Sequence, residues 1–326
     1  MIANLLLSGL ILVVTSIFGT LVSGGVVFDS LFYASDLILF CLLVVILGVF
    51  IFISGYGKSF IKIFSSKNTF EKLEIKTLKE VEKSIIYACK VAAYEAIFFL
   101  CIGTVYYYVN WMNTQTLGFQ LSLMILSVRY ISTIEILLFC MKAVVRKQMI
   151  SIMSEKESPV ETSQKSSGAI LLSLIKIIIY AGIIFGLTVF IIFNYTKNES
   201  DIFFGEIATW LDLPSFILIA IPSLLLLVSN GLWEDFFNGI KHAFSDRKNN
   251  ISEIYKYESS VSTTRYIVLF LSLIIVMLGY NAVLTYLDNK ESLGPNMLVD
   301  TIPCFYAIII NLILLSVEAK LNHLSE

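Results

Sequence analysis

Long uninterrupted runs of apolar residues recur along the chain and are separated by polar connections. A run of about 20 apolar residues can cross a lipid bilayer as an α-helix. Transmembrane β-strands would alternate apolar with polar residues, and these runs do not. The pattern therefore predicts an all-α, polytopic membrane protein. Its eight transmembrane helices are expected at residues 3–25, 35–55, 86–108, 118–142, 169–194, 213–233, 264–286 and 298–317.

The composition leads to the same conclusion. Of the 326 residues, 57% are hydrophobic and only 15% are charged, and the mean hydropathy is +0.83. A soluble domain has no interior large enough to hide so much apolar surface. The net charge of -2 is too small to indicate a nucleic-acid partner, so the lipid bilayer is the expected environment. The five cysteines fall within predicted spans, lack C-x-x-C spacing and are interpreted as small buried residues.

The distribution of lysine and arginine predicts how the helices are oriented. The connections rich in lysine are those at 56–85, 143–168 and 234–263. The connections on the opposite side hold only Lys197 and Lys290. Because basic residues accumulate on the cytoplasmic side, both termini are expected in the cytoplasm. Lys142, Arg146 and Lys147 are then expected to anchor the fourth helix at the inner leaflet.

The sequence also contains an internal repeat. At an offset of 176 residues, identical residues coincide without a gap, such as Gly55 with Gly231 and Gly103 with Gly279. A constant offset of this kind indicates a tandem duplication. The predicted units are a four-helix repeat at 1–153, a cytoplasmic linker at 154–168 and a second four-helix repeat at 169–326. Because each unit has an even number of helices, the two repeats are parallel.

Two stretches of the second repeat carry a recognisable pattern. LDLPSFILIAIPSLLLLVSNGLWEDFFNGIKHAF at 211–244 begins with Asp-x-Pro-Ser and ends in an amphipathic segment, and LGPNMLVDTIPCFYAIIINLIL at 293–314 follows a polar turn. They resemble the second and fourth helices of the MotA/TolQ/ExbB family, most closely the flagellar stator MotA. The positions that match in the fourth helix are Leu293, Gly294, Pro295, Asn296, Met297, Val299, Tyr306 and Leu312. The chain thus resembles a divergent tandem duplication of a MotA-like unit.

This resemblance implies a function. Members of the family are proton- or sodium-driven units of the bacterial cytoplasmic (inner) membrane, and they form rings around the single helix of a partner such as MotB, TolR or ExbD. The chain would be an ion-channel-type subunit of a homo- or hetero-oligomer, coupling ion flow to a single-helix partner. It departs from the family where the fourth helix has pore-facing threonines. Those positions hold Ser127, Val128, Pro303 and Cys304.

Ionisable residues inside the third and fourth predicted spans are candidate site residues. A charge near the bilayer centre costs at least about 2.5–3.5 kcal/mol, so each one needs a partner or a function. From the rise per residue of a helix, Glu95 lies at a depth between Arg129 and Glu135, and the three can form a cluster. Such a cluster is either an ion or proton relay or a buried group that fixes helix packing. Ser127 is the one hydroxyl left at the threonine positions.

The last predicted span adds two polar residues to the candidate ion path. Asp300 lies near the outer end, where it either contributes to the path or stays hydrated. Pro303 is expected to kink the helix by removing a backbone hydrogen bond, and the turn at 293–296 is expected to precede it. Asn311 corresponds to Glu135 in the repeat. The candidate ion path comprises Glu95, Ser127, Arg129, Glu135, Asp300 and Asn311.

Two other functions are compatible with the sequence. The missing threonines favour a non-conducting membrane scaffold or assembly factor derived from the same family, and parallel repeats also occur in solute permeases. The only histidines are His242 and His323, and the sequence has no metal-ligand cluster, phosphate-binding loop or nucleophile arrangement. Neither an enzyme, nor a cofactor, nor a metal site is therefore expected.

Overall fold

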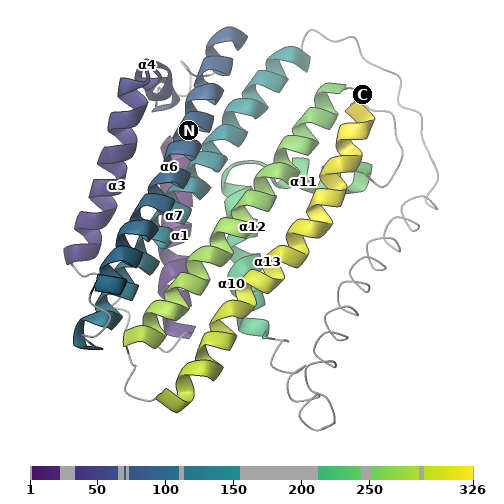
Figure 1. Cartoon of the computed structure of the whole chain (residues 1–326). Coiled ribbons are helices and arrows are strands. Elements are labelled where there is room, and N and C mark those ends of the chain that lie inside the picture. Colours follow the sequence, from purple (N-terminus) through teal and green to yellow (C-terminus); the bar gives the residue numbers. More distant parts are fainter. Residues whose placement is uncertain are drawn as a thin grey trace, which may run out of the picture.

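The computed structural model describes residues 2–22, 34–64, 70, 73–109, 114–154, 212–243, 251–285 and 290–325. Every secondary-structure element in these residues is a helix, which confirms the expected all-α class for this part of the chain (Figure 1). The elements are α1 (Ile2–Val22), α3 (Ala34–Ile53), α4 (Gly57–Ile61), the 3-10 helix η1 (Lys62–Phe64), α6 (Ile75–Val109), α7 (Thr114–Ser154), α10 (Leu213–Ser229), α11 (Trp233–Ala243), α12 (Ile251–Thr285) and α13 (Lys290–Ser325).

Four long helices form the main layer of the structure. α6, α7, α12 and α13 are packed side by side in this order (Figure 1). α3 packs on α6 and α7, whereas α1 and α10 pack on each other and on α12. The contact between α7 and α12 therefore joins the first half of the chain to the second.

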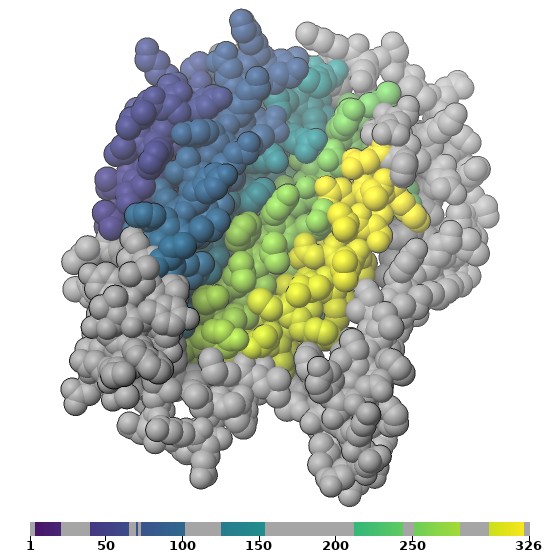
Figure 2. Space-filling view, in the orientation of Figure 1, coloured from purple at the N-terminus to yellow at the C-terminus, as the bar shows by residue number. Residues whose placement is uncertain are grey.

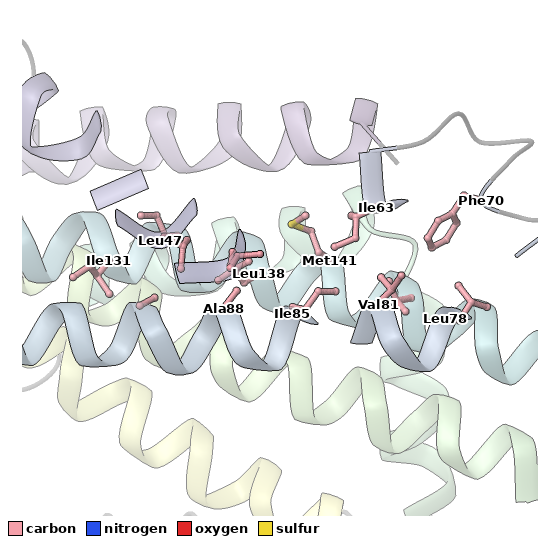
Figure 3. Close-up of a cluster of buried hydrophobic side chains, with 14 of the residues drawn as sticks. Leu47, Ile63, Phe70, Leu78, Val81, Ile85, Ala88, Ile131, Leu138 and Met141 are labelled. Carbon is pink, nitrogen blue, oxygen red and sulfur yellow. The ribbon is translucent and has the colours of Figure 1, made fainter. Parts of the chain in front are cut away.

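The core of the first half follows from the helical spacing of apolar residues. Along α6, buried side chains recur every three or four positions, at Leu78, Val81, Ile85, Ala88 and Ala92. They pack against Leu138 and other residues of α7, and Ile63 and Phe70 close one end of the cluster (Figure 3). Between helices in lipid, this packing contributes through van der Waals contact rather than through removal of apolar surface from water.

A sharp bend follows both α3 and α10. The chain turns by 120° between α3 and α4, and by 109° between α10 and α11. Each bend contains a glycine with positive φ, Gly55 at 82° and Gly231 at 65°. After α10, the amides of Gly231 and Leu232 bond back to the carbonyls of Val228 and Leu227, which is the glycine-dependent way to end a helix. The short helices α4 and α11 therefore cross the direction of the long ones.

Corresponding features recur 176 residues apart in the described structure. α6 and α12 begin at Ile75 and Ile251 and each has 35 residues. The two left-handed glycines differ by the same interval. Fully or almost fully buried pairs at this separation are Leu43 with Ile219, Ile51 with Leu227, Ile85 with Val261, and Val145 with Leu321. Positions 176 residues apart are therefore buried in both halves of the described structure.

Several described helices suit a membrane protein with multiple spans. Within the described residues, three helices are long and apolar enough to cross a bilayer, in α6, α12 and α13, and the number rises to five if each bent pair counts as one span. α1 contains a shorter apolar helix, Asn4–Thr20. The apolar part of α7 includes Arg129, Glu135 and Lys142 within fewer than four turns. The eight expected crossings are thus met only in part and stay a prediction.

Some predicted boundaries are wrong. The span expected at 213–233 ends as a helix at Ser229, because the chain bends there into α11. The turn expected at 293–296 is helical, since α13 begins at Lys290 and continues through Pro303. Pro303 lies well inside this 36-residue helix, and the kink that it is expected to cause stays a prediction.

The predicted division into two four-helix units stays a prediction. The span at 169–194 and nearly all of the linker at 154–168 lie outside the described residues. Leu12 of α1 and Ile136 of α7 share one core cluster with Leu271 and other residues of α10 and α12. The two halves are therefore packed together and do not form separate bodies.

Candidate functional site

Glu95 lies in the buried stripe of α6. It follows Ala88 and Ala92 at helical spacing and is 6% exposed. Neither carboxylate oxygen has a hydrogen-bond partner among the described residues. The expected pairing of Glu95 with Arg129 is therefore not formed. A carboxyl group stands where the packing pattern calls for an apolar side chain.

Glu135 lies on the face of α7 that meets α6. It is 3% exposed, and the thiol of Cys89 on α6 donates a hydrogen bond to its carboxyl group. Its Oε2 atom is buried without a hydrogen-bond partner in the described part of the chain. A neutral thiol leaves most of the cost of burying a charge uncompensated. The interface between α6 and α7 thus holds two buried carboxyl groups, those of Glu95 and Glu135.

Arg129 does not belong to the same cluster. It is six residues before Glu135, which places the two side chains about 120° apart around α7. Arg129 is buried and lies at helical spacing from Ile136 and Cys140, which pack in the cluster that contains α12 residues. Its guanidinium carbon is 4.9 Å from the centre of the Tyr130 ring. The three side chains therefore do not meet in the cluster that helix depth allows, because Arg129 and Glu135 lie on different faces of α7 and Glu95 of α6 has no hydrogen-bond partner among the described residues.

Ser127 and Asn311, the two uncharged candidates for the ion path, lie on different helices. Ser127 is buried on α7. The side-chain amide of Asn311 on α13 donates to the carbonyl of Ala307, one turn earlier in the same helix, at 2.9 Å. Asn311 is equivalent to Glu135 by position, but its amide group is bonded within its own helix rather than to a neighbouring one.

Asp300 packs directly on Gly279. A Cβ atom at position 279 would overlap the carboxyl carbon of Asp300, so the absence of a side chain on α12 makes room for this carboxylate on α13. The Oδ2 atom of Asp300 is buried and has no hydrogen-bond partner among the described residues. Next to it, the hydroxyls of Tyr280 and Thr301 are 2.7 Å apart and join the same two helices. Gly279 was visible in the sequence as a repeat match, but its contact was not.

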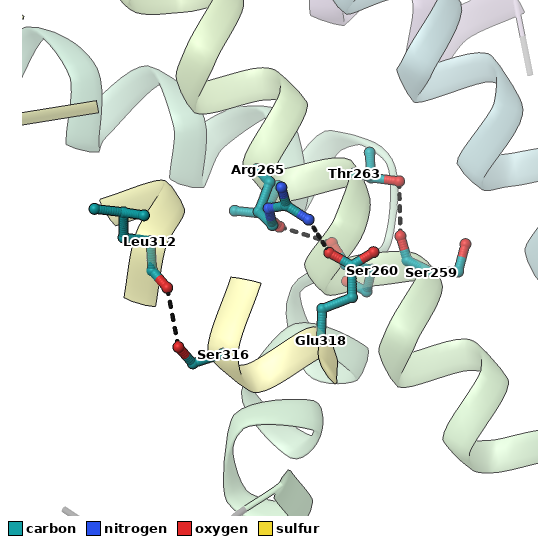
Figure 4. Close-up of polar contacts among 8 residues, drawn as sticks. Ser259, Ser260, Thr263, Arg265, Leu312, Ser316 and Glu318 are labelled. Carbon is teal, nitrogen blue, oxygen red and sulfur yellow. Dashed lines mark hydrogen bonds and ion pairs between the residues drawn. The ribbon is translucent and has the colours of Figure 1, made fainter. Parts of the chain in front are cut away.

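Ion pairs join the long helices at the end of the helices that lies away from Asp300. Arg146 of α7 pairs with Glu258 of α12 at 3.0 Å, and Arg265 of α12 pairs with Glu318 of α13 (Figure 4). Lys147 pairs with Asp235 of α11 at 2.9 Å and donates to the carbonyl of Gly231. Arg146 and Lys147, which were expected to anchor a helix at the inner leaflet, thus also pair with acidic groups of α12 and α11.

A second polar contact links α1 to the end of α10. The amide nitrogen of Asn230 donates to the hydroxyl of Ser8 at 3.0 Å and to the carbonyl of Leu226 at 2.8 Å. Ser8 also lies 3.3 Å from the hydroxyl of Ser229. Ser8 and Asn230 border a cavity of about 10 Å³, which is about the space that one water needs. The contact fixes the start of the chain to the bend after α10.

The chemistry of the site is that of isolated carboxyl groups. No group of three or more His, Cys, Asp or Glu side chains in the described residues is arranged to hold a metal ion. Comparisons with protein-family models, with curated proteins and with solved structures find no match to this chain. Functional conclusions therefore depend on Glu95, Glu135 and Asp300 and on the helices that hold them.

Proposed function

We propose that this chain is an ion-channel-type membrane subunit that moves protons or sodium ions and couples their flow to a partner with one transmembrane helix. The observation that carries the proposal is the carboxyl group of Glu95, which is buried in α6 without a hydrogen-bond partner in the described structure. Intramembrane carboxyl groups are expensive and are typical of proton and ion pathways. A carboxyl group there is useful if it exchanges a proton or a cation.

Glu135 supplies a second position for the same exchange. It lies on α7, the helix next to α6, and also has a buried oxygen without a partner among the described residues. Asp300 offers a third carboxyl group between α12 and α13. The path that we propose runs along the surfaces between these paired helices. Ser127 lies on α7 and contributes a buried hydroxyl.

The proposal includes the arrangement of the chain as two parallel four-helix units with eight crossings. It is supported by the equal lengths of α6 and α12, by the left-handed glycines of the two bends and by the equivalent buried positions of the two halves. The resemblance of residues 211–244 and 293–314 to the MotA/TolQ/ExbB family supports both the ionic function and a location in the bacterial cytoplasmic membrane.

A non-conducting scaffold is the second candidate function. It is favoured by the ion pairs between helices, in which Arg146 and Arg265 are already neutralised by Glu258 and Glu318. Such pairs hold helices in a fixed arrangement and carry no ions themselves. A scaffold would hold its single-helix partner in the membrane without any ion flow.

Ion flux through liposomes separates the two functions. The purified chain, alone and together with the single-helix protein that co-purifies from its own host, would be reconstituted with a pH-sensitive dye or a sodium-sensitive dye inside. A proton or sodium gradient is then imposed, with empty liposomes as the reference. Flux above the reference in either preparation supports the channel. Flux equal to the reference in both, with the partner retained, identifies the scaffold.

A further inference from the structure

The contact between α7 and α12 is an aromatic interface with an ion pair at one end. The ring of Phe139 on α7 stacks on Tyr266 of α12, with ring centres 4.0 Å apart, and lies 5.9 Å from Phe270. Arg146 and Glu258 pair further along the same two helices. This interface joins the last helix of the first half to the third helix of the second half.

The surface of α7 that contacts α12 has a counterpart on α13, and the surface of α12 that contacts α7 has a counterpart on α6. These two counterparts do not meet within one chain. The residue 176 positions after Phe139 is Leu315 on α13, and the residue 176 positions before Phe270 is Tyr94 on α6. α6 and α13 stand at opposite ends of the layer (Figure 1). Leu315 is 45% exposed and Tyr94 is 73% exposed. The two outer helices of the layer, α6 and α13, thus each carry one of the two surfaces that meet between α7 and α12 in the middle of the layer.

Exposure of the apolar side chains agrees with this account. The apolar window of α12, which is covered by α7 and α13, is 61% buried, whereas those of α6 and α13 are each only 28% buried. The exposed apolar residues on α6 include Ile86, Tyr94, Ile97 and Phe98, and those on α13 include Ile308, Leu312 and Leu315. In Figure 2, side chains of α13 line the surface along much of the helix.

From this geometry we infer that α6 of a second copy of the chain docks on α13 of the first and repeats the contact that α7 makes with α12. The contact is head-to-tail, so each added copy offers a new α13 surface until a ring closes. The layer of four helices then continues from one copy to the next. The inference uses the correspondence between the two halves and is independent of whether the protein conducts ions.

The charges on the two surfaces are complementary. Lys142 lies one turn from Phe139, with its Nζ atom 5.8 Å from the centre of that ring, and its equivalent on α13 is Glu318. Tyr266, the stacking partner of Phe139, corresponds to Lys90 on α6. Lys90 is exposed and makes no ion pair among the described residues. Docking therefore brings Lys90 of one copy close to Glu318 of the next, whose carboxylate also pairs with Arg265 of its own chain.

A disulfide between copies tests the inference. Exposed native thiols are first removed by Cys41→Ser and Cys101→Ser. Chains with Lys90→Cys and chains with Leu315→Cys, carrying different tags, are then co-expressed and oxidised in native membranes. A disulfide is expected between differently tagged chains, and loss of it is expected when either chain is expressed alone. The same background with Phe139→Cys and Tyr266→Cys should form a disulfide within one chain, which verifies the fold.

Contact by random collision is excluded with a position on another helix. Val228 on α10 is 56% exposed, and Val228→Cys replaces Leu315→Cys in the control. If the control cross-links to Lys90→Cys as well as Leu315→Cys does, or if no disulfide forms between chains while the disulfide within the chain does, the inference is overturned and the exposed faces are covered by lipid.

A charge variant gives a second readout of the same interface. Asn322, which is exposed, is the equivalent of Arg146, and Glu82 is the equivalent of Glu258. Asn322→Glu should weaken association of the purified protein about two- to fivefold, and Asn322→Arg should strengthen it by a similar factor. The same two substitutions at exposed Asn238 on α11 are the matched control. Equal effects at both positions, measured by mass photometry, would contradict the proposed contact.

Discussion

Asp300 of α13 occupies the space that a side chain on Gly279 of α12 would fill. The carboxylate and the glycine lie on different helices and are 21 positions apart in the chain. This close contact allows a half-buried acidic residue, with its Oδ2 atom fully buried, to sit between two apolar helices. It also makes position 279 sensitive to the smallest side chain.

Gly279→Ala should destabilise the protein by about 1–3 kcal/mol, because the new methyl group forces α12 and α13 apart. The measurement is thermal unfolding in detergent. Gly48→Ala is the matched control, since no atom lies within 4 Å of the Cβ added there. The control should be neutral or stabilising by up to about 1 kcal/mol. Equal unfolding temperatures for the two variants would show that Asp300 does not pack on Gly279.

The two bends make a paired prediction. Gly55 and Gly231 both have positive φ, a conformation that costs a residue with a Cβ atom roughly 1–2 kcal/mol. Gly55→Ala and Gly231→Ala should each lower the free energy of unfolding by about that amount. Neither added Cβ would collide with a neighbouring atom, so the backbone conformation alone accounts for the loss. A loss at only one of the two positions would contradict the equivalence of the bends.

The pair of Arg265 and Glu318 should show strong energetic coupling. Both side chains are largely removed from solvent, so Glu318→Gln leaves the guanidinium with a poorer partner. We expect a coupling of about 1–2 kcal/mol between Arg265→Met and Glu318→Gln in a double-mutant cycle, reduced from the fully buried case by partial exposure. Additive single effects would mean that the pair contributes nothing to helix packing.

Lys147 should hold the bend after α10 in place. It bonds to the carbonyl of Gly231 and to Asp235 of α11. Lys147→Met should therefore increase hydrogen exchange of the amides in α11. Lys142→Met, which removes a nearby lysine that makes no ion pair among the described residues, is the control and should leave this exchange unchanged. Unchanged exchange in both variants would contradict this function of Lys147.

The sequence predicts elements better than contacts. The helical class and the positions of α3, α6 and α12 follow from apolar runs, because the length and hydropathy of a segment are local properties. The partners of Arg146 and Arg265 do not follow, because they depend on how far one helix is rotated against the next. The separation of Arg129 from Glu135 is an intermediate case. Depth alone suggested a cluster, whereas the angular position around α7 excludes it.

The boundaries that failed have a different cause. Residues 293–296 have the composition of a turn, but α13 begins at Lys290 and passes through them. In α10 the helix stops at Ser229, within the apolar run, because Gly231 permits a left-handed turn there. Local composition predicts a turn at residues 293–296, where the chain is helical, and predicts none after Ser229, where the chain turns. In neither place does hydropathy mark the end of the helix.

Proton flux through the Glu95→Gln variant tests the central claim most directly. Inverted membrane vesicles from cells that express the chain with its native partners would report proton flux through a pH-sensitive dye and sodium flux through a sodium-sensitive dye. Glu80→Gln, an exposed position on the same helix, is the control. The account predicts that Glu95→Gln lowers proton or sodium flux at least about tenfold, while Glu80→Gln leaves it unchanged, as expected for a group in an ion pathway. Equal flux in the wild type, Glu80→Gln and Glu95→Gln would contradict it.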